Sequence, residues 1–155
     1  MQNDRVIAAI RAHHDELAED LDTRVTRVID GARLGVVAQA QQELVRWCNT
    51  ELLPHARAEE PTIYQAGQAL VPTALLVRAM LAEHRSIRDA IAALTAATDP
   101  LEIVQAAITV RAVFRVHLTK ENDLLLPALD EAGLDLAPLL DGMHDLVGEG
   151  ASHPA

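Results

Sequence analysis

Apolar residues recur three and four positions apart along most of the chain, which is the period of an amphipathic helix. The first such stretch predicts a helix over residues 4–30, with Gly31 as its C-terminal cap. Further stretches predict helices over about 34–60, from Pro72 or Thr73 through Leu94, and from Asp99–Pro100 to Pro127. Four helices joined by short connections predict an all-α fold, an antiparallel up-down-up-down four-helix bundle.

Polar residues interrupt these apolar stripes at repeated places. The first and third stripes each contain a lone histidine, and the second and fourth each end in His-x-x-x-Glu. Residues four apart share one face of a helix, so each His-x-x-x-Glu directs an imidazole and a carboxylate the same way. At ~1.5 Å of rise per residue, each helical hairpin brings its lone histidine to within about 8 Å of the matching pair along the helix axis. The residues expected to face the core are His14, His55, Glu59, His84, His117 and Glu121.

Prolines and glycines mark the irregular parts of the chain. Pro54 predicts a kink directly before His55, and Pro61 to Pro72 predict an irregular connection with a short helical turn near Tyr64. Residues 130–155 predict a tail that covers one end of the bundle, with a short helix over 139–147. We therefore expect one domain, a four-helix bundle over residues 1–129, followed by a C-terminal tail over 130–155 that packs on it.

Composition and charge narrow the classes of partner. The chain has 155 residues, half of them apolar and only 2% aromatic, as expected for one domain of packed helices. Its formal charge of −10 disfavours nucleic acid and anionic membrane surfaces. No stretch reaches the ~18 apolar residues of a membrane span, the N-terminus lacks an apolar signal region, and Cys48 is the only cysteine. These features predict a cytoplasmic protein without an internal disulfide.

The inward-facing histidines and glutamates predict a metal site, because buried polar groups are costly unless something satisfies them. Four imidazoles and two carboxylates are too many for one tetrahedral zinc. They divide over two metal ions as two histidines each, with both carboxylates available to bridge. Two divalent ions would leave a net charge of about +2, which attracts a small anion such as oxide, hydroxide or peroxide. The alternative is a helical interaction module in which these side chains satisfy one another.

The pattern H…H-x-x-x-E…H…H-x-x-x-E resembles the hemerythrin-like (HHE cation-binding) domains, in particular those of bacterial hemerythrin-like proteins. The resemblance covers roughly Val6 to Leu129. It implies a four-helix bundle with a non-haem di-iron centre, two iron ions per chain joined by an oxo or hydroxo bridge. It also implies that the six core-facing residues are the ligands, with Glu59 and Glu121 bridging the irons.

The chain departs from the oxygen-carrying hemerythrins in two features. Those proteins have an H-x-x-x-H pair on the third helix and an H-x-x-x-x-D ending, whereas Met80 and Arg88 flank His84 here and Asn122 replaces the aspartate. One imidazole is missing, which leaves coordination positions for water, peroxide or another side chain. We therefore predict binding of small oxygen species with catalase-like decomposition of hydrogen peroxide, rather than oxygen storage. The alternative is a non-enzymatic protein that binds or senses oxygen, nitric oxide or iron.

Tyr64 is the one additional candidate ligand. In an unbroken helix it would point about 180° away from His55, so it reaches the metal only if Pro61 bends the chain. Otherwise it packs in the core with its hydroxyl at the surface. Glu60 is expected to be a solvated neighbour of the site, and His13 and His144 are expected to be surface imidazoles.

Overall fold

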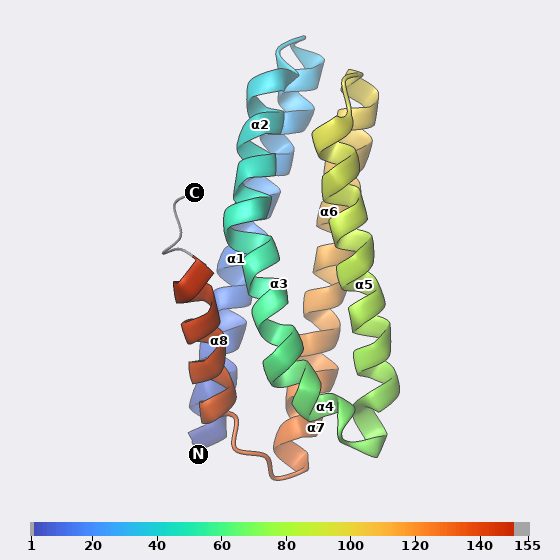
Figure 1. Ribbon diagram of the computed structural model, residues 1–155. Helices are drawn as coiled ribbons and strands as arrows, with labels where there is room; N and C mark the ends of the chain where they lie inside the picture. The colour runs from blue at the N-terminus through green and yellow to red at the C-terminus, as the bar shows by residue number, and fades with distance from the viewer. Residues whose placement is uncertain (1, 151–155) are drawn as a thin grey trace.

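Helices make up nearly all of the chain that the structure, a computed structural model, describes (Figure 1). Residues 2–150 are described, with side chains over 3–143, and this part contains no β-strand. Its long helices lie side by side: α1 (Gln2–Arg33), α2 (Val37–Trp47) continued by α3 (Leu53–Glu59), α5 (Val71–Ala96) and α6 (Pro100–Lys120). α1 packs against α2 and α6, and α5 packs against α6 and α2. The all-α fold class is confirmed.

The turn between α1 and α2 differs from the sequence-based prediction. Gly35, with a φ of 75°, makes the reversal after α1, so the prediction that Gly31 caps this helix is wrong. Gly31 lies inside α1, where a Cβ atom would be 3.1 Å from the Cα of Val37. The glycine therefore allows close approach of α1 and α2. α6 begins as predicted, because the Asp99 carboxylate accepts hydrogen bonds from the backbone N–H groups of Leu101 and Glu102.

Three π-helical turns interrupt the helices near the predicted site: η1 (Cys48–Leu52), η2 (Glu60–Tyr64) and η3 (Glu121–Leu125). A proline ring clashes with the carbonyl four residues before it. For Pro54 that carbonyl belongs to Thr50 in η1, and for Pro127 it belongs to Asp123 in η3. The distortion predicted at Pro54 therefore takes the form of a widened turn rather than a break.

The connection predicted to be irregular between Pro61 and Pro72 is mostly helical, so that prediction is wrong. η2 absorbs Pro61, and α4 (Gln65–Gln68) continues the helix directly afterwards. The backbone becomes extended only at Leu70, whose φ and ψ are −97° and 126°. A π-helical turn accommodates the proline without ending the helix.

The C-terminal segment contains α7 (Leu126–Glu131) and α8 (Ala137–Gly150). α8 is longer than predicted and lies alongside α1 and α3 rather than across an end of the molecule (Figure 1). Leu136 and Met143 are buried there in one apolar cluster with Ile10 and Ile63. Within residues 2–150, no helix combines the length and apolar character needed to cross a membrane.

The buried apolar residues form two clusters along the helices. One contains Leu17, Ile87 and Phe114, and the other contains Ile10 and Met80, among others. On α1 the chain passes from the second cluster at Ile10 to the first at Leu17, and His14 lies between them. The buried histidines and glutamates thus form a polar layer between two apolar clusters, which separate these side chains from water.

Candidate metal centre

The polar layer contains all six residues predicted from the sequence to face the core. Each is almost completely inaccessible to solvent, with side chains between 0% and 4% exposed. They come from distant parts of the chain: His14 (α1), His55 and Glu59 (α3), His84 (α5), His117 (α6) and Glu121 (η3). The structure therefore brings together every predicted ligand candidate, although the sequence positions span more than a hundred residues.

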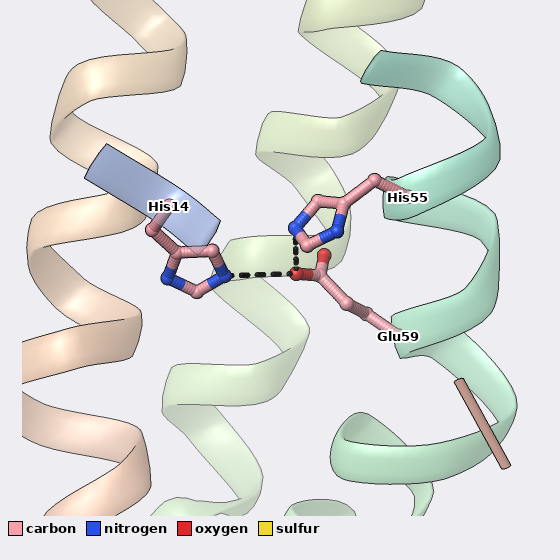
Figure 2. Close-up of side chains that lie close together, drawn as sticks. All are labelled: His14, His55 and Glu59. Carbon is pink, nitrogen blue, oxygen red and sulfur yellow. Dashed lines mark ion pairs between the residues drawn. The ribbon is translucent and has the colours of Figure 1, made fainter. Parts of the chain in front are cut away.

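His14, His55 and Glu59 form the first group of possible metal ligands, with one ligand atom from each lying within 4.8 Å of the others. The three side chains converge from α1 and α3 (Figure 2). Glu59 Oε1 lies 2.7 Å from His55 Nε2 and 3.7 Å from His14 Nε2. Two nitrogens and one oxygen thus surround a space suited to a metal ion.

Glu59, His84 and His117 form the second group, again within 4.8 Å of one another. The Nε2 atoms of the two histidines are 3.2 Å apart, and Glu59 Oε2 lies 3.3 Å from that of His84. Glu121 Oε2 lies 3.5 Å from His117 Nε2. Glu59 belongs to both groups and offers a different oxygen to each, which is the arrangement of a bridging carboxylate.

Tyr64 reaches into the second group. Its side chain is 1% exposed, and its hydroxyl lies 2.7 Å from His117 Nε2 and 3.4 Å from Glu59 Oε2. The alternative placement, with the hydroxyl at the surface, is therefore wrong. Tyr64 follows Glu59 by five residues, and the π-helical turn η2 places residues five apart on one face. An α-helical register would have directed the ring elsewhere.

Three of the four histidines direct their other ring nitrogen outward, to a hydrogen-bond acceptor. These Nδ1 contacts join His14 to Asn122 Oδ1 (2.7 Å), His84 to Glu60 Oε1 (3.0 Å) and His117 to Glu83 Oε2 (3.1 Å). An acceptor at Nδ1 keeps a proton there, so Nε2 is the nitrogen that faces the layer and can offer its lone pair to a metal ion. The imidazoles are thus oriented as metal ligands are.

Glu83 and Asn122 were not identified from the sequence as hydrogen-bond acceptors for the histidines, and Glu60 was assigned no contact with the site. Glu60 was expected to be a solvated neighbour, yet it holds His84 in place while remaining partly exposed. Glu83 precedes His84 in the sequence but binds His117 on the neighbouring helix, for which no sequence signal exists. Asn122 was noted only as a replacement for aspartate. Each partner depends on which helix lies opposite, so only the packing reveals it.

The polar atoms inside the layer test whether the residues fit a cation. Buried side-chain atoms that make no hydrogen bond include Nε2 of His14, Nε2 of His55, Oε1 of Glu59 and Oε1 of Glu121. His55 Nε2 and Glu59 Oε1 are 2.7 Å apart but are not aligned for a hydrogen bond. A buried polar atom left without a partner costs about 1–3 kcal/mol. All four are lone-pair donors of the kinds that iron and other divalent transition metals accept. The residues present therefore fit a bound metal.

The protonation states of the site follow from its charges. Burial raises the pKa of Glu59, but the surrounding histidines outweigh it and hold that pKa well below its usual range. Burial lowers the pKa of His117, but Glu121 and Glu59 outweigh it and raise that pKa to about 9. Burial and the same two carboxylates raise the pKa of Tyr64 well above its usual range. The carboxylates thus favour positive charge in the layer, from protons or from metal ions.

The remaining histidines lie elsewhere. His13 is exposed and meets His55 edge to face, with ring centroids 5.0 Å apart, so it borders the layer from outside. The side chain of His144 lies outside the described residues.

Comparison with known proteins agrees with this site. The chain matches the family model described as hemerythrin HHE cation binding domain over residues 5–129, and again over residues 75–149. No curated protein and no solved structure matches the chain. The family match and the clustered histidines and glutamates together indicate metal binding. The chain therefore belongs to the hemerythrin HHE cation-binding family.

Proposed function

We propose that this chain is a non-haem di-iron protein that binds small oxygen species and decomposes hydrogen peroxide in a catalase-like reaction. The observation that carries the proposal is the pair of buried ligand groups that share Glu59. The long helices would form the antiparallel four-helix bundle of the family over residues 1–129. Residues 130–155 would be a tail packed on that bundle, and the protein would act in the cytoplasm.

Each ligand group would hold one iron. His14 and His55 would bind the first, and His84 and His117 the second, with Glu59 and Glu121 bridging. Tyr64 would complete the second position after losing its proton, since its hydroxyl already lies within hydrogen-bonding distance of His117 Nε2. Two irons supply a two-electron couple between diferrous and diferric states, as disproportionation of peroxide requires.

The protein residues control access and orientation. The apolar clusters on both sides of the layer exclude water, which strengthens electrostatic interactions within it. The acceptors at Nδ1 fix the rings of His14, His84 and His117. With four histidines instead of five, positions remain open for a small anion.

The first test measures the metal content of the purified protein and its reaction with hydrogen peroxide. We expect about two irons per chain, an oxo-bridged ferric absorption in the near ultraviolet, and evolution of oxygen over many turnovers after hydrogen peroxide is added. His117→Ala should lose at least one iron, whereas the matched variant His13→Ala should keep both. Protein without near-stoichiometric iron would overturn the di-iron proposal, and iron-loaded protein without turnover would overturn the catalytic part.

Tyr64 has its own spectroscopic test. If its phenolate binds ferric iron, the protein should absorb in the visible range through charge transfer from the phenolate. Tyr64→Phe should lose this band while keeping its iron, because the histidines and carboxylates remain. An unchanged visible spectrum in the variant would show that Tyr64 is not a ligand.

The second candidate function is a non-enzymatic sensor of oxygen, nitric oxide or iron. It is favoured by the position of α8, which packs on η2 and α3, the segments that carry Tyr64, His55 and Glu59. A change at the site could therefore move α8. Iron-loaded protein that does not turn over peroxide, but whose α8 becomes more sensitive to protease on adding nitric oxide, would support this function.

A further inference from the structure

The two ligand groups differ in what lies behind their histidines. His84 and His117 each donate their Nδ1 proton to a carboxylate, from Glu60 at 3.0 Å and from Glu83 at 3.1 Å. His14 donates instead to the neutral amide oxygen of Asn122 at 2.7 Å. His55 packs edge to face with His13, and its contact with a carboxylate among the described side chains, Glu59, is through Nε2 rather than Nδ1. The hydrogen-bond acceptors behind His84 and His117 are therefore negatively charged, whereas the acceptor behind His14 is neutral.

Both carboxylates are held in place by cations on their outer side. Glu60 Oε1 lies 3.3 Å from a guanidinium nitrogen of Arg88, and Glu83 pairs with the ammonium of Lys120. Arg88 is 38% exposed, so water screens its charge, whereas the hydrogen-bonded ring of His84 is 1% exposed. The pairs therefore fix the carboxylates without cancelling their effect on the buried rings.

A carboxylate at Nδ1 makes an imidazole a stronger donor to a metal than an amide does. It accepts the Nδ1 proton in a charge-assisted hydrogen bond, which raises the electron density at Nε2. Removing such a partner typically costs 10–100-fold in metal affinity. Glu59 lies in both groups and cannot create a difference between them. The outer carboxylates, by contrast, act on one group only.

We propose that Glu60 and Glu83 are positioning residues that make the two metal positions unequal. The position at His84 and His117 fills first and holds its ion more tightly. The position at His14 and His55 fills second and releases its ion first. This inference rests on the proposed di-metal centre and adds an order of loading to it.

The test is a cobalt(II) titration of metal-free full-length protein, followed by optical absorption and by competition with a chelator. Wild-type protein should bind two ions in two resolved steps. Glu60→Gln and Glu83→Gln should each weaken the first step by about 10–100-fold and leave the second nearly unchanged. Asn122→Ala should weaken only the second step. Glu43→Gln is the matched control, because it removes a carboxylate from an ion pair with Arg27 that joins α1 to α2 outside the polar layer, and it should alter neither step.

Proton resonances of the cobalt-loaded protein give a readout that general destabilisation would not produce. Nδ1 protons of cobalt-bound histidines are strongly shifted and exchange with water. After one equivalent of cobalt(II) is added, the shifted exchangeable resonances should come from the Nδ1 protons of His84 and His117. Glu83→Gln should therefore alter these resonances, and Asn122→Ala should not. Two equivalent steps, or equal weakening of both steps by the Gln variants, would overturn the inference while leaving the di-metal centre intact. Absence of cobalt binding by wild-type protein would overturn both.

Discussion

The charges of individual residues determine whether the polar layer binds protons or metal ions. Glu59 and Glu121 are fully buried, and the surrounding histidines are the nearest groups that can neutralise them. Burial lowers the pKa of His117 and of His14, but Glu59 and Glu121 outweigh it and raise both pKa values, that of His117 to about 9. A metal ion and a proton thus compete for the same nitrogen.

This competition predicts how metal affinity depends on pH. The pKa of His117 is raised from 6.5 to about 9, so metal-free protein carries the proton across that range and must release it to bind metal. Affinity for cobalt(II) should therefore increase by at least about tenfold per pH unit from pH 6.5 and level off near pH 9. Chelator competition at several pH values measures this slope. An affinity that stays constant over the range would contradict the prediction.

At the scale of helical elements, the π-helical turns determine which side chains face the layer. η2 lets Tyr64 share a face with Glu59, and η3 begins at Glu121 itself. The wider turns also bring α4 against α5 and η3 at Gly67. There a Cβ atom would lie 2.9 Å from Val77 Cγ2 and 3.0 Å from Leu125 Cδ1. The register of these segments therefore depends on a residue without a side chain.

Gly67→Ala should destabilise the protein for this reason. Val77 and Leu125 are completely buried, so neither can move aside freely, and overpacking of this kind costs about 1–3 kcal/mol in the free energy of unfolding. Urea denaturation followed by circular dichroism measures the loss. The matched control is Gly142→Ala in α8, where the added Cβ meets only Thr62 Cγ2 at 3.4 Å. Equal stability changes in the two variants would contradict the packing argument.

At the scale of the whole molecule, Asn3 joins the beginning of the chain to its C-terminal segment. Its amide nitrogen donates to Asp130 Oδ1 at 2.7 Å and to the Leu134 carbonyl at 2.8 Å. Its amide oxygen accepts from the Leu136 backbone N–H at 3.1 Å. These bonds fix the connection between α7 and α8, and so the position at which α8 covers α3.

Asn3→Ala should weaken this attachment. Loss of three hydrogen bonds that are partly buried should lower the free energy of unfolding by about 1–3 kcal/mol. It should also increase hydrogen exchange in α8 before the rest of the molecule unfolds. Asn49→Ala is the matched control, since its exposed amide bonds only the Val45 carbonyl within the same helical segment. Unchanged exchange in α8 would show that Asn3 does not hold it.

Much of this architecture could be predicted from the sequence, because the repeated stripes of apolar residues depend on neighbouring positions within each helix. The period of three and four residues predicted the helices, and the polar breaks at His14 and His84 predicted which residues face the core. The Asp99 cap was predicted from its own neighbours. Predictions failed at Gly31 and between Pro61 and Pro72, where the outcome depends on contact with another helix or on a π-helical turn.

By itself, the sequence determined the helical fold class and the six polar residues of the layer, since both follow from the spacing of residues within each helix. Only the tertiary structure decided that Glu59 is shared by two groups, that Tyr64 points inward, and that Glu60 and Glu83 support their histidines. The physical reason is that these relations join different helices or depend on a widened turn. A hydrogen bond between neighbouring helices produces no periodic pattern in the sequence, so only the packing of the helices shows which residues form it.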